Sequence, residues 1–147
     1  MKIYMEYRFY RKGKIENIKP INTEYKGINN PYDLYDALTN IWCEYSCAPR
    51  MRPEWSKENM TLGQCSITSF LVQDIFGGEV YGVLLPDGAY HCFNKVGDME
   101  FDLTSEQFQG EKLTYTLEYP QSRKEHFSSE EKYRRYLYLC KQLKINK

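Results

Sequence analysis

The stretch from Gln64 to Asp102 constrains the fold most, because it joins one helical pattern directly to three strand patterns. Apolar residues between Ile67 and Ile75 recur at helical spacing, and Gly77–Gly78 ends the pattern. The segments "EVYGVLL", "YHCFNKV" and "MEFDL" follow, and short turns containing glycine separate them. This spacing is typical of antiparallel hairpins. A helix followed by an antiparallel meander predicts the α+β class, with the helix packed on a small sheet.

The flanking segments predict how the rest of the chain is organised. Residues 2–10 alternate apolar and polar side chains, and residues 15–21 have the pattern of a shorter return strand, so we expect an N-terminal β-hairpin. Asn30 and Pro31 have the pattern of a helix start. Further expectations are a loop at 47–61, a short helix at 105–108 and a strand or extended segment at 111–119.

With 147 residues, the chain has the length of one domain. We divide it into an N-terminal addition (1–28), a catalytic-like core (30–108) and a C-terminal helix (128–145).

The composition excludes several classes of function. The 20 basic and 20 acidic residues give zero formal net charge, whereas nucleic-acid binders usually carry a basic excess. No apolar run reaches the ~18–20 residues that cross a bilayer. The N-terminus does not have the pattern of a secretory signal, and five cysteines do not suggest a disulfide framework. We therefore expect a cytoplasmic protein with reduced thiols and without nucleic-acid or membrane partners.

Three residues in this arrangement have the chemistry of a nucleophilic site. Cys65 lies at the predicted helix N-terminus, where free N–H groups and the helix dipole favour a thiolate. His91 falls on the middle strand of the meander, and Asp102 falls on the next strand. A turn near Gly97 places His91 close to Asp102 or its neighbour. We predict a Cys65–His91–Asp102 triad of nucleophile, base and orienting carboxylate.

Three neighbouring residues are candidates for substrate binding or for stabilising an oxyanion. Gln64 directly precedes the predicted nucleophile, although the backbone N–H of Cys65 is the better placed oxyanion donor. Trp55 either walls a cleft or packs on the helix. Asn94 is an alternative orienting residue, but strand alternation directs it to the face opposite His91.

These motifs resemble known families. "GQC" at a helix start, a His followed by an aromatic residue on a strand, and "DLT" on the next strand resemble the transglutaminase-like branch of the papain-like cysteine enzymes. The order of Trp55, "GQC", "QDIFGGE", "HCFN" and "DLTSEQF" is similar to that of YunG-like bacterial proteins. The first resemblance implies a papain-like, transglutaminase-like fold with a cysteine nucleophile.

The triad predicts acyl transfer through a thioester, with an amide- or peptide-containing substrate, such as a protein. Hydrolysis, deamidation and transfer to an amine stay open, as does the oligomeric state, and no metal or organic cofactor is implied. One alternative is a binding or regulatory module without turnover, in which Cys65 is an inert buried thiol. A second is a zinc-stabilised domain that draws four ligands from Cys43, Cys47, Cys65, His91 and Cys92, although their spacing is unusual for zinc.

Overall fold

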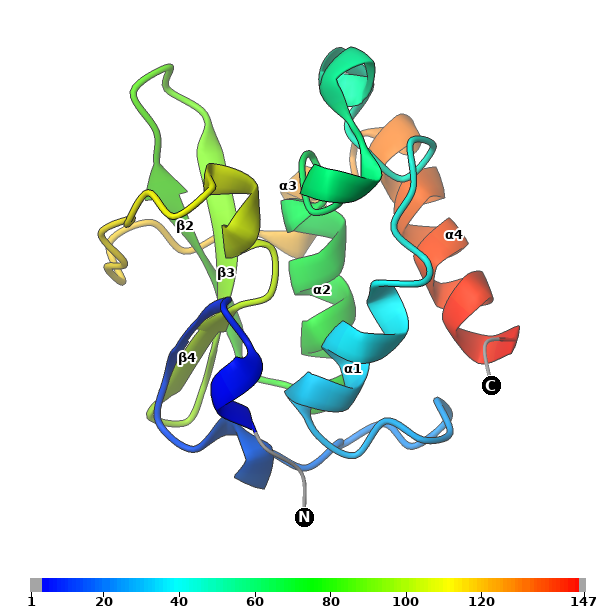
Figure 1. Cartoon of the computed structure of the whole chain (residues 1–147), viewed down its shortest axis with the longest axis vertical. Coiled ribbons are helices and arrows are strands. Elements are labelled where there is room, and N and C mark those ends of the chain that lie inside the picture. Colours follow the sequence, from blue (N-terminus) through cyan, green and yellow to red (C-terminus); the bar gives the residue numbers. More distant parts are fainter. Residues whose placement is uncertain (1–3, 146–147) are drawn as a thin grey trace.

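The computed structural model describes residues 4–145, and over that range the chain is α+β with a four-stranded antiparallel sheet in the order β1-β4-β3-β2 (Figure 1). Helices α1, α2 and α4 lie together on one side of this sheet (Figure 1). The strands are β1 (Tyr10–Lys12), β2 (Glu79–Leu84), β3 (Tyr90–Val96) and β4 (Met99–Asp102). The α-helices are α1 (Pro31–Leu38), α2 (Cys65–Phe76), α3 (Arg123–His126) and α4 (Glu130–Ile145). Short 3-10 helices are η1 (Tyr4–Glu6), η2 (Ile15–Asn17), η3 (Pro49–Glu54), η4 (Lys57–Asn59) and η5 (Ser105–Phe108).

Helix α2 is the centre of the core, as its apolar pattern predicts. It packs against β3 on one side and α4 on the other, so most of its side chains are buried. Within this packing, the indole N–H of Trp42 donates to Oγ1 of Thr68 at 3.0 Å. Gly77, at φ 79°, ends the helix in a backbone conformation that only glycine adopts freely. The helix and the three-stranded meander after it are therefore confirmed.

The start of α1 is also confirmed, with the predicted capping. Oδ1 of Asn30 accepts a hydrogen bond from the backbone N–H of Asp33 at 3.0 Å, and Pro31 occupies the first turn. The predicted C-terminal helix is present as α4, which begins with two glutamates and ends near a lysine.

The predicted N-terminal β-hairpin is wrong. Residues 2 and 3 of the expected strand lie outside the described residues, and η1 occupies part of the remainder. The expected return strand contains η2, and β1 pairs with β4 instead, with Tyr10 opposite Asp102. The physical reason is aromatic packing, because the alternating rings of this segment contact α1 rather than a second strand. Tyr4 stacks on Tyr32 with ring centroids 4.0 Å apart, and the ring centroid of Phe9 lies 4.9 Å from that of Tyr35.

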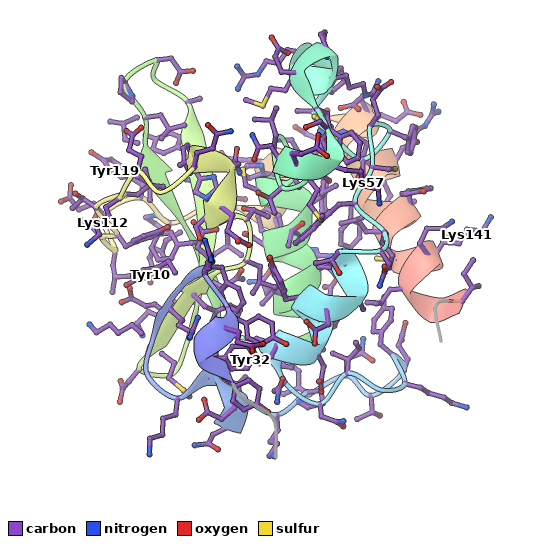
Figure 2. All side chains as sticks on the ribbon, viewed as in Figure 1. Tyr10, Tyr32, Lys57, Lys112, Tyr119 and Lys141 are labelled. Carbon is purple, nitrogen blue, oxygen red and sulfur yellow. The ribbon has the colours of Figure 1, made fainter. Side chains whose placement is uncertain are left out.

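Two other segments differ in detail from expectation. The predicted loop 47–61 contains η3 and η4, and the predicted short helix is the 3-10 helix η5. Residues 111–119 form no strand. Directly after them, Pro120 forms an isolated β-bridge with Tyr81 on the outer edge of β2. This segment crosses the face of the sheet away from the helices. Figure 2 shows Tyr10, Lys112 and Tyr119 on that side.

Within the described residues, no helix has the length and apolar character needed to cross a membrane.

His126, at the end of α3, is half-buried against Phe70, with ring centroids 5.1 Å apart. Its Nε2 lies 2.8 Å from Oε1 of Gln121, and its Nδ1 lies 2.9 Å from Nζ of Lys132. Burial and the charge of Lys132 lower the pKa of His126 to about 4. The imidazole is therefore neutral at neutral pH, and a proton on Nδ1 would face an ammonium group.

This burial predicts a pH-dependent stability. An unfolded histidine has a pKa of about 6.5, so the unfolded chain binds more protons than the folded chain between pH 6.5 and 4. We expect the free energy of unfolding to fall as the pH decreases through this window. His126→Gln, which cannot ionise, should flatten that part of the profile in urea titrations followed by circular dichroism. Parallel profiles for the two proteins would contradict the prediction.

Candidate active site

His91 and Asp102 are joined by a direct hydrogen bond. Nε2 of His91 lies 2.6 Å from Oδ2 of Asp102, and the side chains are only 2% and 1% exposed. The strand register explains this contact. Asn94 of β3 pairs with Phe101 of β4, which puts Asp102 opposite Phe93. Asp102 is therefore a diagonal neighbour of His91 on the same face of the sheet. The predicted pairing through a turn near Gly97 therefore brings the two side chains together.

The Asp102 carboxylate has further hydrogen-bond donors. The hydroxyl of Tyr115 donates to Oδ2 at 2.7 Å. The backbone N–H and the hydroxyl of Thr104 donate to Oδ1 at 3.1 and 3.2 Å. A buried carboxylate is tolerated when such donors replace its water shell. These contacts fix the orientation of Asp102 and, through it, the imidazole of His91.

Cys65 is the first residue of α2 and is partly exposed. The thiol and the backbone N–H of Cys92 and the imidazole of His91 lie close enough to its sulfur to stabilise a thiolate. The last register pair of β3 with β4 is at Asn94, so the backbone N–H of Cys92 lies beyond the paired part of β3 and is available to the sulfur. Since Asp102 occupies Nε2 of His91, Nδ1 is the nitrogen left for the sulfur. The three predicted residues thus form one continuous chain of contacts.

The electrostatics of the pair favour a thiolate beside an imidazolium. The hydrogen bond from the Cys92 thiol, together with the charge and hydrogen bond of His91, lowers the pKa of Cys65 well below its ordinary value despite burial. Burial opposes a charge on His91, but Asp102 and Cys65 outweigh it and raise the pKa of His91 to about 10. Both shifts favour the charged form of the pair.

The backbone N–H of Cys65 is free among the described residues, since it has no hydrogen-bond acceptor there. Free N–H groups at a helix N-terminus stabilise negative charge. The arrangement can therefore hold a thiolate and, beside it, an oxyanion.

The three candidates for substrate binding or oxyanion stabilisation each donate a hydrogen bond to a backbone carbonyl outside the triad. Gln64 is fully buried, its Nε2 donates to the carbonyl of Cys43 at 3.1 Å, and its Oε1 has no partner among the described residues. The indole of Trp55 donates to the carbonyl of Met60 at 3.0 Å. Asn94 donates to the carbonyl of Ser69 in α2 at 2.9 Å, on the face opposite His91. Their hydrogen bonds join the segments around the start of α2 and the sheet, and none is with a member of the triad.

Sequence reasoning missed three contributors. Tyr115 lies in an irregular segment and carries no local signal of its contact with Asp102. The ring of Phe108 meets the His91 ring edge-on at 4.7 Å, whereas the sequence places Phe108 only in a short helix and in the motif "DLTSEQF". The sequence indicates Cys92 only as part of the motif "HCFN" and as an alternative metal ligand, and its position next to His91 is the available signal of its contact with Cys65.

Among residues 4–145 the structure shows no group of three or more His, Cys, Asp or Glu side chains arranged to hold a metal ion.

Fold and site together define an α+β protein that brings a thiol at a helix N-terminus together with an imidazole and a buried carboxylate of the adjoining sheet. The chain matches the family described as YunG protein over residues 30–146, and it therefore belongs to the YunG family. It is 34% identical over 101 residues to "Uncharacterized protein YunG" of Bacillus subtilis (strain 168), a match covering 65% of this chain and 78% of that relative. No solved structure matches the chain.

The contact between Cys65 and Cys92 generates a prediction about thiol acidity. Cys92→Ala removes the S–H donor, so the apparent pKa of Cys65 should rise. Iodoacetamide labelling rates measured against pH, with the modified residue mapped by mass spectrometry, report that pKa. Because alanine leaves only a small cavity in the core, we expect a stability loss of about 1 kcal/mol.

Cys92→Ser is the matched control, because its hydroxyl keeps a donor near the sulfur. Its labelling profile should lie between those of the wild-type protein and Cys92→Ala. If Cys92→Ala labels with the wild-type pH profile, the thiol of Cys92 does not stabilise the thiolate.

Proposed function

We propose that this protein is a cysteine-dependent acyl-transfer enzyme acting on an amide- or peptide-containing substrate. Cys65 is the nucleophile, His91 is the general acid and base, and Asp102 orients His91. The observation that carries the proposal is the continuous chain of contacts from the Cys65 sulfur through the imidazole to a buried, fully hydrogen-bonded carboxylate. Such a chain is the arrangement that nucleophilic catalysis requires.

The first half of the reaction forms a thioester. The thiolate of Cys65 attacks the carbonyl carbon, a C–S bond forms, and the π electrons move to oxygen. The free backbone N–H of Cys65 can donate to this oxyanion. When the intermediate collapses, the C–N bond breaks and the imidazolium of His91 gives its proton to the leaving amine.

The second half releases the acyl group. A water molecule or an amine attacks the thioester while the neutral imidazole of His91 accepts its proton. The C–S bond then breaks and returns the thiolate. Water as acceptor gives an amide hydrolase, peptide hydrolase or deamidase, and an amine gives an acyltransferase.

The papain-like, transglutaminase-like relationship is part of this proposal. Its support is the order of elements: a cysteine begins a core helix, a histidine lies on a central strand, and an aspartate ends the following strand. In this arrangement the orienting residue and the base are diagonal neighbours in a sheet, and the nucleophile comes from the helix packed on it.

Thiol reactivity tests the nucleophile. An ordinary thiol is only a few per cent thiolate at pH 7. We expect Cys65 to react with iodoacetamide about tenfold or more faster than Cys47, Cys92 or Cys140, whose pKa values burial or contact with Cys65 raises. Its rate should rise less steeply between pH 7 and 9 than that of an ordinary thiol, because the neighbouring Cys92 thiol and His91 lower the pKa of Cys65 well below its usual value.

Two variants serve as controls. Cys65→Ala should abolish the fast labelling and leave the free energy of unfolding within about 1 kcal/mol, since the residue is partly exposed. Cys43→Ser should leave the labelling intact, which separates Cys65 from the other thiol with a lowered pKa. Uniform slow labelling of all five cysteines would contradict the proposal.

A second candidate function is a binding or regulatory module that keeps the site without turnover. The observation that favours it is the near-complete burial of His91, at 2% exposure. An acyl thioester distinguishes the two. Incubation with activated acyl esters, followed by intact-mass measurement, should show acylation of Cys65 and its loss on adding hydroxylamine. Rapid labelling without any acyl turnover would support the module.

A further inference from the structure

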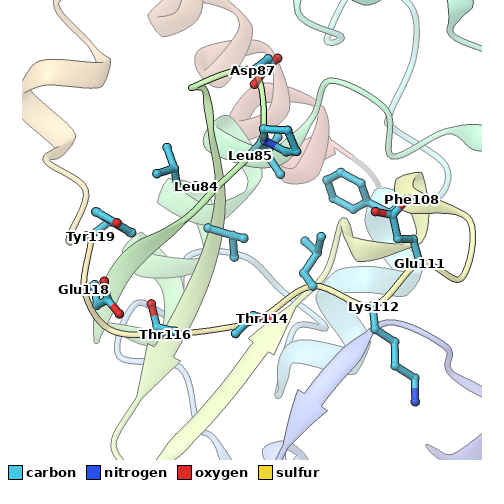
Figure 3. A pocket seen from close by; sticks show the side chains of 13 residues that line it. Leu84, Leu85, Asp87, Phe108, Glu111, Lys112, Thr114, Thr116, Glu118 and Tyr119 are labelled. Atoms are coloured by element: carbon cyan, nitrogen blue, oxygen red, sulfur yellow. The ribbon is translucent and has the colours of Figure 1, made fainter.

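A cavity of about 570 Å³ opens between the tip of the β2–β3 hairpin and the segment 111–119 (Figure 3). Its walls include Val83, Leu84 and Phe108. The volume lies within the range of ligand-binding pockets. Figure 3 shows Leu84, Leu85 and Asp87 on the hairpin side and Lys112 to Tyr119 along the opposite side.

Two wall residues place this cavity beside the imidazole of the candidate site. Phe108 lines the cavity and meets the His91 ring edge-on, with centroids 4.7 Å apart and an interplanar angle of 86°. Val83 also lines the cavity and is the cross-strand partner of His91 in β3. The cavity therefore adjoins the group that gives a proton to a leaving amine or takes one from an entering nucleophile.

The cavity also exposes part of a sheet edge. β2 is an outer strand, and its outward backbone groups at Val80 and Gly82 are bonded to Gln121 and Tyr119 at 2.9 and 2.8 Å. Backbone groups of alternate residues in β2 point away from β3, and Leu84 is the next such residue after Gly82. Its backbone N–H has no partner among the described residues. An extended peptide can pair with such an edge and continue the sheet.

The charges around the cavity are unequal. Asp87, Glu111 and Glu118 line it together with one base, Lys112, and all four side chains are exposed. None of them forms an ion pair within residues 4–145. Because the whole chain has zero net charge, this acidic excess is a local property of the cavity. It favours a positively charged occupant.

We propose that this cavity binds an extended, positively charged peptide segment on the amine side of the reacting bond, paired with the free edge of β2 at Leu84. The inference rests on the proposed function, because the amine side is defined by His91 as the proton donor. The backbone pairing supplies affinity for an extended chain, and the acidic rim selects basic side chains.

The test uses the full chain carrying Cys65→Ala, so that binding is measured without turnover. The probe is a fluorescent, acetylated and amidated hexapeptide of alternating lysine and threonine. Its comparator replaces each lysine with glutamate. Fluorescence anisotropy at about 0.1 M ionic strength, where exposed charges still interact over ~10 Å, gives the two Kd values. We expect the lysine peptide to bind about tenfold tighter or more.

Variants separate backbone pairing from charge. Leu84→Pro removes the edge N–H at a position where an outer strand tolerates proline, and it should weaken binding about three- to tenfold. Leu84→Ala keeps the N–H and should stay close to the parent protein. Glu111→Gln should weaken binding of the lysine peptide and Lys112→Gln should strengthen it. Asp98→Asn, on the distant β3–β4 turn, is the charge-matched control and should change nothing (Figure 1).

Equal affinity for the two peptides, or no binding of either, overturns the inference. If wild-type Cys65 still labels rapidly, the proposed function survives that result. Peptide binding with the expected variant effects, but without rapid labelling of Cys65, overturns the assignment to an amine side and the catalytic proposal together. If Leu84→Pro fails to fold, the opposite effects of Glu111→Gln and Lys112→Gln still decide the charge selectivity.

Discussion

The hydrogen bond between His91 and Asp102 joins two side chains that have lost almost all contact with water, and the surrounding structure compensates for that loss. A buried carboxylate with unsatisfied oxygens would destabilise the fold by several kcal/mol. Tyr115 and Thr104 supply the remaining hydrogen bonds. Because this cluster fixes the imidazole, the sulfur of Cys65 meets a ring of defined orientation.

The N-terminal segment supports this cluster although it lies largely outside the family match. Tyr10 of β1 pairs with Asp102, donates its backbone N–H to Oγ of Ser105 at 2.8 Å, and stacks on Tyr115 at 3.8 Å between ring centroids. The family match begins at residue 30. In this chain, therefore, the segment expected to be an addition to the core helps to bury the carboxylate that orients His91.

Much of the core and of the candidate triad was predictable, because both depend on short-range patterns. Apolar spacing and Gly77 defined α2, and hairpin spacing placed His91 and Asp102 on neighbouring strands. The N-terminal hairpin was not predictable in the same way. Its alternation suits a strand, but the contacts of Tyr4 and Phe9 with α1 decide its conformation, and no local pattern reports a contact partner.

The sequence by itself determined which thiol, imidazole and carboxylate are candidates for a site and which elements hold them, since residue type and periodicity are local properties. Only the tertiary structure decided that Tyr115 binds Asp102, that Cys92 lies against the Cys65 sulfur, and that a cavity adjoins His91. The contact of Tyr115 and the cavity depend on the irregular segment 111–119, which crosses the sheet. The contact of Cys92 depends on where the pairing of β3 with β4 ends. Their course follows from long-range packing rather than from any repeating pattern along the chain.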